Sequence, residues 1–147
     1  MNEAMKNLLT RRSVRKYKPE QITDEELRAV LEAGTYAPTA RGTQSPLIVA
    51  VQNAEDIALM SRLNAAVWGR ADFDPFFGAP TVVVVFAQAG NANGVQDASL
   101  VMGNLLNAAH ALGLGSCWIN RAREVFEMPE GKALLKKWGI EGDYIGV

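Results

Sequence analysis

The stretch TVVVVFA, residues 81–87, decides the fold, because its β-branched and apolar residues continue without polar alternation. Such a run is typical of a strand that other elements cover on both faces. The stretch LIVAVQ, residues 47–52, has the same character, and Pro46 and Pro80 come just before the two runs. We therefore predict a central, buried sheet that contains strands at 47–52 and 81–87.

Two helical patterns flank these strands in the sequence. In ITDEELRAVLEAG, residues 22–34, Thr23 is placed as an N-cap and Glu26 completes a capping box. Gly34 is expected to end this helix. The stretch VQDASLVMGNLLNAAHALGLG, residues 95–115, has almost no polar stripe, so we expect a helix that is buried nearly all round, in the core or at a subunit interface.

The C-terminal third carries shorter patterns. SCWI at 116–119 predicts a short strand, and MPEGKALLKKW at 128–138 predicts a helix with Pro129 in its first turn. DYIGV at 143–147 predicts the opening of a further strand. Because a strand opens so near the last residue, we expect residues 1–147 to form one domain of a longer protein.

Composition excludes several classes of protein. No apolar run approaches the length of a membrane span, and the N-terminus lacks the apolar core of a signal peptide, so we expect a cytoplasmic protein. Cys117 and His110 are the only cysteine and histidine, which argues against a disulfide within the chain and against a thiolate zinc site. A pI near 5.8 argues against general nucleic-acid binding.

Basic residues crowd into RRSVRKYK, residues 11–18, although the net charge of the chain is -1. The cluster consists of Arg11, Arg12, Arg15, Lys16 and Lys18. Like charges repel, so the cluster needs either water around it or an anion to hold. Composition alone leaves both interpretations open.

Other candidate motifs have simpler explanations. GLGS at 113–116 follows a helix and precedes a strand, which is the reverse of a dinucleotide-binding loop. His110 has no nucleophile or carboxylate at helical spacing, so we interpret it as a core or interface residue. Asp72 and Asp74 fit turn chemistry before Pro75 better than a carboxylate pair, and Cys117 fits a packed thiol. With no acid, base, nucleophile or metal site in view, a cofactor is the economical source of chemistry.

Five stretches together resemble the nitroreductase family of FMN-dependent oxidoreductases. They occur in the family's order and spacing, and they are RRSVRKY (11–17), APTARGTQSP (37–46), GAPTVVVV (78–85), DASLVMGNLL (97–106) and LGLGSCWI (112–119). The resemblance implies an α+β fold with a central, mostly antiparallel sheet flanked by helices. It also implies an entwined homodimer with FMN at the subunit interface, no catalytic side chain, and electron transfer from NAD(P)H to a small planar acceptor such as a nitroaromatic or quinone.

The resemblance also implies a set of cofactor contacts. Arg11, Arg12 and Ser13 match residues that hold the ribityl phosphate and chain, and Arg15 matches the cation beside flavin N1 and O2. A loop from the other subunit is matched by Pro38, Thr39, Ala40, Gly42 and Gln44. The segment that presents a backbone N–H to flavin N5 is matched by Trp118, Ile119 and Asn120.

Three departures from the family pattern keep alternatives open. The family usually continues past DYIGV (143–147) through a last strand and a tail with further Lys or Arg contacts to phosphate, so the resemblance implies a domain that lacks its C-terminal strand and tail. Arg121 stands where the family often has Gly, and Asp72 and Pro75 stand nearest to where larger members place an Asn and a Lys. A flavin-binding sensor or carrier without turnover is therefore one alternative to an enzyme. A cofactor-free domain that uses the basic cluster to bind a partner is another.

Overall fold

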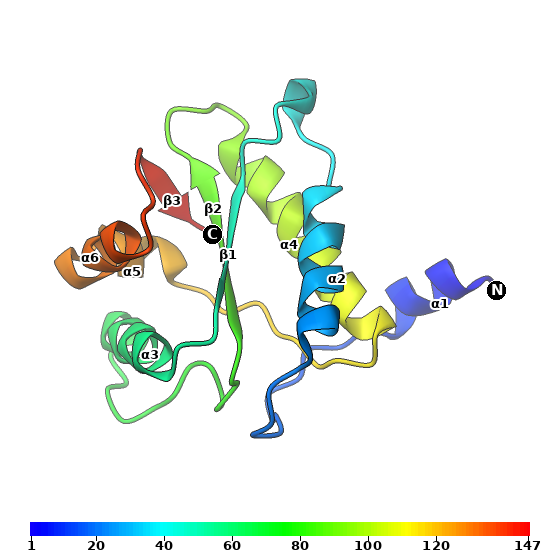
Figure 1. The fold of residues 1–147 in the computed structure, drawn as a ribbon, viewed down its shortest axis with the longest axis horizontal. Helices are drawn as coiled ribbons and strands as arrows, with labels where there is room; N and C mark the ends of the chain where they lie inside the picture. Colours follow the sequence, from blue (N-terminus) through cyan, green and yellow to red (C-terminus); the bar gives the residue numbers. More distant parts are fainter.

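Both predicted central strands form, as β1 (Leu47–Val51) and β2 (Val82–Gln88), in a computed structural model that describes all residues 1–147. β3 (Tyr144–Gly146) completes an antiparallel sheet of order β1-β2-β3 (Figure 1). The remaining elements are α1 (Glu3–Thr10), α2 (Asp24–Thr35), the 3-10 turn η1 (Ala40–Gly42), α3 (Ala54–Trp68), α4 (Gly94–Ala111), α5 (Ala122–Glu127) and α6 (Pro129–Lys137). The fold is therefore α+β, as the family resemblance implies.

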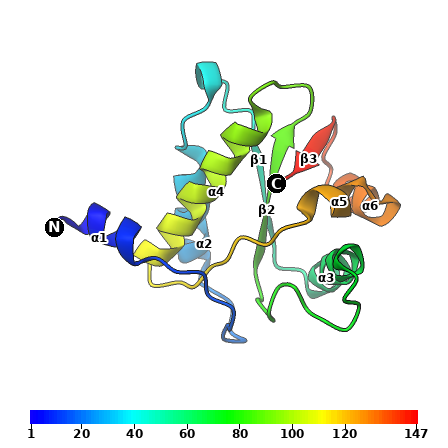
Figure 2. The ribbon, with the colours of Figure 1, turned by 180° about the vertical axis from the view of Figure 1, so that it is seen from behind.

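β2 is the centre of the molecule, because helices cover both of its faces. Val85 and Ala87 belong to a core cluster that includes residues of α2 and α4. Val84 and Phe86 belong to a second cluster on the other face, with residues of α3, α5 and α6. Figures 1 and 2 show these two helical layers on opposite sides of the sheet. The continuous apolar run in β2 thus reflects burial on both faces.

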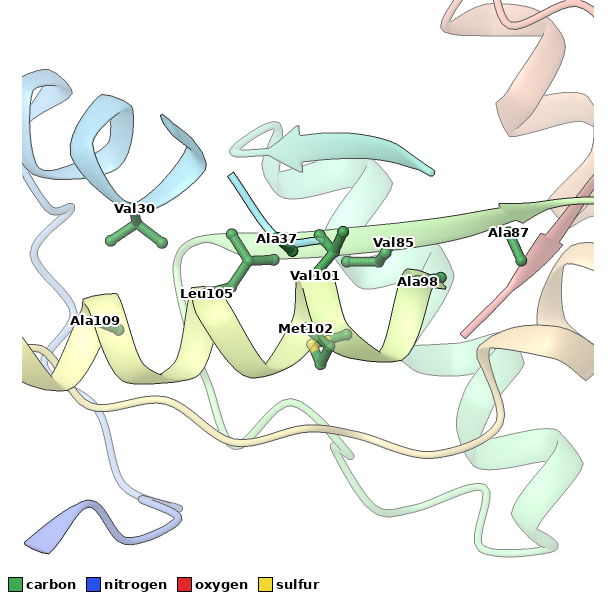
Figure 3. Packing of buried hydrophobic residues seen from close by; sticks show 9 residues of the cluster. All are labelled: Val30, Ala37, Val85, Ala87, Ala98, Val101, Met102, Leu105 and Ala109. Atoms are coloured by element: carbon green, nitrogen blue, oxygen red, sulfur yellow. The ribbon is translucent and has the colours of Figure 1, made fainter. Parts of the chain in front are cut away.

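α2 begins with the predicted capping box, in which Thr23 Oγ1 accepts from the Glu26 N–H and the Glu26 carboxylate accepts from the Thr23 N–H. We predicted that Gly34 ends this helix, but the prediction is wrong: Gly34 lies within α2 and is buried. A Cβ on Gly34 would lie 2.7 Å from Leu105 Cδ2, so glycine here allows α2 to pack closely on α4. Figure 3 shows Val30 of α2 and Leu105 of α4 in this cluster.

α4 forms as predicted, but the single chain does not bury it all round, so its burial at a subunit interface stays a prediction. Ala98, Val101 and Leu105 face the core (Figure 3). Leu100 and Val95, on the same helix, are 51% and 45% exposed. The helix ends at Ala111, before Gly113, which has a φ of +76° and so does not continue the helix.

Residues 116–119 do not form the predicted strand. Ser116 O accepts a hydrogen bond from the Val14 N–H over 3.0 Å, but the stretch joins no ladder of the sheet. The apolar side chains of this stretch do not pack in the sheet; Trp118 and Ile119 line a cavity described below. The helices α1, α3 and α5 were not predicted. None of the helices has both the length and the apolar character needed to cross a membrane.

Asp56 ties α3 to α6 through its buried carboxylate. Lys137 Nζ donates to Asp56 Oδ1 over 2.6 Å, and Trp138 Nε1 donates to Oδ2 over 3.1 Å. The hydrogen bonds from Lys137 and Trp138 lower the pKa of Asp56 and outweigh its desolvation. Because the folded-state pKa is depressed, this contribution to stability is present above about pH 4 and is lost as the pH falls further.

We expect Asp56→Asn to lower the free energy of unfolding at pH 7 by about 1–2 kcal/mol, since Lys137 is half exposed and water screens the ion pair. Urea unfolding at pH 7 and at pH 3 measures the effect, which should shrink at pH 3. Glu127→Gln is the control, because the pair that Glu127 forms with Arg123 is well exposed. An equal loss at both pH values would contradict the role of the Asp56 charge.

Candidate functional site

The basic segment of residues 11–18 is an extended connection between α1 and α2, beside the C-terminal end of α4. α1 is held against α4 by a bond from Asn7 Nδ2 to Asn107 O, and Thr10 Oγ1 and His110 Nε2 lie 2.9 Å apart. His110 therefore has a structural contact, in agreement with its interpretation as a core or interface residue. This packing positions the first arginine of the segment at the end of α1.

Arg11 carries the clearest sign of a missing ligand. Its Nη1 atom is buried and has no hydrogen-bond partner. None of the basic side chains in the segment forms a salt bridge, because the only two in the chain join Arg123 to Glu127 and Lys137 to Asp56. A buried guanidinium nitrogen without a partner is costly, and an anion with several oxygens would satisfy it. The residues present therefore fit a phosphate group.

The other side chains of this segment that are predicted to contact the cofactor differ in whether they already form hydrogen bonds within the chain. Arg12 is exposed, but its Nη1 already donates to the carbonyl oxygens of Leu9 and Arg11. Ser13 and Arg15 are exposed, and neither side chain has a hydrogen-bond partner within the chain. The positive charge of this segment is thus directed to solvent or to a ligand rather than to a carboxylate of the protein.

The structure packs this basic segment against residues 115–116, which directly precede the predicted N5 segment. The Val14 N–H donates to Ser116 O, and a Cβ on Gly115 would lie 3.0 Å from Val14 Cγ1. Tyr17 donates its hydroxyl to Val14 O over 2.5 Å. Burial, together with the nearby Cys117 thiol, raises the pKa of Tyr17 to about 12, so its hydroxyl remains a donor at neutral pH. Cys117 is half-buried, in agreement with a packed thiol.

The predicted loop contacts lie elsewhere on the chain. Pro38, Thr39, Ala40, Gly42 and Gln44 follow the C-terminal end of α2, whereas the basic segment precedes its N-terminal end (Figure 1). α2 has 12 residues, so about 18 Å of helix separates the two groups. One chain therefore does not bring the two groups together.

Hydrogen bonds within the loop fix its shape. Thr39 donates to Gln44 Oε1 over 2.6 Å, and the Gln44 N–H donates back to Thr39 Oγ1 over 2.9 Å. Gln44 Nε2 also donates to Thr35 O over 2.8 Å. The two side chains expected to meet a flavin edge are therefore bonded to one another in the single chain.

Asp97 supports the same loop and was missed by sequence reasoning. Its carboxylate is buried, and Oδ1 accepts from the Ala40 N–H over 3.0 Å. Oδ2 is buried without a partner. Asp97 is the only acidic residue of α4 and lies in its first turn, and this pattern could have pointed to it.

Asp74 has the predicted role in a turn. One carboxylate oxygen accepts from the Ser61 hydroxyl and the Phe76 N–H, and the other accepts from the Gly78 N–H. Desolvation alone would raise the pKa of Asp74, but these three hydrogen bonds together lower it. Asp72 is exposed and does not join this turn, so the two carboxylates do not form a pair.

A cavity of about 550 Å³ lies between the sheet, α2, α4 and the segment that leads into α5. Figure 2 shows that segment crossing from the end of α4 to the other side of the sheet. Most of the lining is apolar, and Trp118 and Ile119 are the predicted site residues that reach it. Sequence reasoning did not predict this cavity.

Asn120 and Arg121 form a tight turn beside that segment. Asn64 of α3 donates through Nδ2 to Asn120 O over 2.8 Å, and its Oδ1 accepts from Arg121 Nε over 2.8 Å. Arg121 takes the left-handed backbone conformation, with φ at +79°. The buried Asn64 side chain therefore fixes the backbone of the predicted N5 segment at Asn120.

The chain is an α+β protein with a helix-flanked antiparallel sheet and an arginine segment that no carboxylate pairs with. A sequence profile described as the nitroreductase family matches residues 8–146. The chain belongs to the nitroreductase family.

Individual relatives agree with this assignment. A putative NADH dehydrogenase/NAD(P)H nitroreductase of Archaeoglobus fulgidus is 34% identical over 124 residues, which cover 81% of this chain and 68% of the relative. An FMN reductase [NAD(P)H] of Bacillus subtilis is 27% identical over 160 residues, which cover 88% of this chain and 61% of the relative.

A solved structure shows the same fold. The nitroreductase with bound FMN from Bacteroides fragilis superimposes with a TM-score of 0.90 at 28% identity. The match covers 99% of this chain and 86% of that chain. The arrangement of helices about the sheet is thus that of a nitroreductase.

Proposed function

We propose that the protein is an FMN-dependent oxidoreductase that transfers electrons from NAD(P)H to a nitroaromatic, a quinone or a similar planar acceptor. The main support for this proposal is Arg11 Nη1, which is buried without a hydrogen-bond partner. It lies in a basic segment that forms no salt bridge within the chain. Membership of the nitroreductase family and the FMN-bound relative support it. When bound, FMN supplies the chemistry, by accepting a hydride from NAD(P)H and passing the electrons to the acceptor.

The residues of the chain have separate tasks in this proposal. Arg11, Arg12 and Ser13 hold the phosphate and ribityl chain, since guanidinium groups bind phosphate oxygens bidentately. Arg15 places a cation beside the N1/O2 edge, where it favours the more negative, reduced cofactor. Trp118, Ile119 and Asn120 present backbone to N5, and the Asn64 bond to Asn120 O fixes that backbone. No side-chain acid or base is assigned.

We expect the protein to bind FMN in preference to FAD, because the basic segment suits one terminal phosphate and the chain has no glycine-rich pyrophosphate loop. Titration of the protein with each flavin, followed by flavin fluorescence, measures the two dissociation constants. Equal or tighter binding of FAD would contradict the assignment of the phosphate to Arg11 and Arg12.

We also propose an obligate homodimer. α1 has no buried residue, and Leu8, Leu9 and Leu100 are all more than half exposed on α1 and α4. Apolar side chains gathered on adjoining helices favour burial by another surface. Pro38, Thr39, Ala40, Gly42 and Gln44 then reach the cofactor of the partner, which would explain why one chain keeps them apart from Arg11.

We expect Leu100→Asp to shift the protein toward monomer and to weaken FMN binding with it, because assembly and cofactor binding are linked. Sedimentation equilibrium with and without FMN measures both effects. Ala133→Asp, on an exposed position of α6, is the control and should leave the dimer intact. A folded wild-type monomer that retains FMN would rule out the proposed dimeric site.

A further inference from the structure

Arg121 has a backbone conformation that glycine adopts readily and that residues with a Cβ disfavour. Its φ is +79° and its ψ is +7°. Such strain persists only where the surroundings fix it, and it concentrates at functional sites. An arginine in this position therefore raises the question of what its side chain does.

The surroundings of Arg121 hold both its backbone and its side chain. The Arg121 N–H donates to Asn120 Oδ1 over 2.8 Å, and Nε donates to Asn64 Oδ1 over 2.8 Å. Asn64 is only 3% exposed, so this bond is made to a fixed, buried partner. The side chain is thus aimed in one direction by the protein core.

Two guanidinium groups pack against the ring of Trp68. Arg121 Cζ lies 4.2 Å from the centroid of the Trp68 ring, and Arg70 Cζ lies 4.8 Å from the same ring. Arg70 also lies 4.5 Å from the Phe73 ring. The two guanidinium carbons are therefore at most about 9 Å apart, on an indole that is itself 41% exposed.

No carboxylate forms an ion pair with either cation. The loop holds two acids, of which the exposed Asp72 pairs with neither arginine. The other, Asp74, has both oxygens engaged in its own turn. Only Nε of Arg121 is bonded, so its Nη1 and Nη2 groups remain available as donors. Two like charges that are held together without a counter-charge attract an anion.

We propose that Arg70 and Arg121, arranged on Trp68, bind the pyrophosphate of the nicotinamide nucleotide that reduces the enzyme. This rests on the proposed function, in which Asn120 lies beside the reacting edge of the cofactor. Arg121 is the next residue in the chain, and one ribose separates the pyrophosphate from the reacting nicotinamide ring. Planar guanidinium forks match the paired oxygens of a pyrophosphate.

The test compares two reductants of the FMN-loaded protein under anaerobic conditions. NADH carries the pyrophosphate, whereas 1-benzyl-1,4-dihydronicotinamide has the same reacting ring and no phosphate. We expect the double variant Arg70→Gln, Arg121→Gln to raise the half-saturating NADH concentration at least about tenfold. Its rate with the benzyl compound should change by less than about twofold.

Two further variants keep the test decisive. Arg123→Gln removes an exposed arginine of α5 that pairs with Glu127, and it should leave the NADH dependence unchanged. Arg70→Gln alone leaves the strained turn intact, because Arg70 makes only ring contacts, and it should raise the NADH requirement at least about threefold. It therefore tests the site even where the double variant fails to fold.

Several results would overturn the proposal. Unchanged NADH dependence, or an equal loss with both reductants, would show that the arginines do not act on the pyrophosphate. If the variants bound FMN more weakly but kept the wild-type half-saturating concentration of NADH, Arg70 and Arg121 would be assigned to FMN binding instead. Slower reoxidation by 4-nitrobenzoate but not by nitrobenzene would assign the anion to the acceptor. In each case the wild-type protein is still reduced by NADH or NADPH, whereas failure of the proposed function would leave it unreduced by both nucleotides.

Discussion

Gly131→Ala should lower the free energy of unfolding by at least about 3 kcal/mol or prevent folding. A Cβ at this position would lie 2.0 Å from Val125 O, 2.8 Å from Val125 C and 2.9 Å from Phe126 Cα. These are backbone atoms of α5, which no rotamer change can move. Replacing glycine by alanine inside a helix normally gains about 1 kcal/mol, so the clash has to exceed that gain.

The geometry of α5 and α6 explains why the clash cannot relax cheaply. Met128 alone links the two helices, as the C-cap of α5 and the N-cap of α6. Val125, Phe126 and Leu134 from these helices belong to the core cluster around Phe86. Separating the helices would therefore open that core.

Gly103→Ala is the matched control, and urea unfolding of both variants measures the difference. Gly103 lies inside α4 at a helical φ, and a Cβ there would meet nothing within 4 Å. This variant should be stabilised by about 0.5–1 kcal/mol. A Gly131→Ala variant as stable as the wild-type protein would contradict the close contact between α5 and α6.

Arg11→Ala should weaken FMN binding at least about tenfold, because it removes a charge-assisted contact worth about 1.5–3 kcal/mol. The stability of the protein without FMN should not fall, since the lost Nη1 is a buried donor without a partner. We expect Arg12→Ala to weaken FMN binding in the same direction. The measurements are FMN titrations and urea unfolding without the flavin.

Lys16→Ala is the control for net charge, because Lys16 belongs to the same segment and no flavin contact is assigned to it. It should change FMN affinity by less than about threefold. If Lys16→Ala and Arg11→Ala weakened binding equally, the segment would act only as a diffuse positive surface.

Arg15→Gln should separate cofactor tuning from cofactor binding. It should retain more FMN affinity than Arg11→Ala but lower the reduction potential of the bound flavin, because the reduced form loses a neighbouring cation. Equilibrium redox titration of both variants measures this difference. An unchanged potential in Arg15→Gln would remove Arg15 from the N1/O2 edge.

The sequence predicted those elements whose local pattern and tertiary role coincide. Val84 and Phe86 alternate with Val85 and Ala87 between two cores, so a continuous apolar run was informative. α3 was missed although Asn53 caps it, and residues 116–119 were assigned to a strand they do not form. Whether an extended stretch pairs depends on neighbours that local residues do not specify.

Some features of the candidate site could likewise be predicted from the sequence, and others could not. The charge of residues 11–18 was visible in the sequence, as was the resemblance that linked it to residues 118–120. The unpartnered Nη1 of Arg11 and the support of Ala40 by Asp97 were not visible, because each depends on packing between segments distant in the chain. The arrangement of Arg121, Asn64 and Trp68 was hidden for the same reason.

The most direct test of the proposed function is the visible absorption spectrum of the FMN-loaded protein, recorded anaerobically before and after addition of NADH or NADPH. We expect a bound oxidised-flavin spectrum that bleaches with at least one of the two nucleotides and returns when a quinone or nitroaromatic is added. A protein that binds no FMN, or whose bound flavin stays oxidised with both nucleotides, would contradict the proposed oxidoreductase.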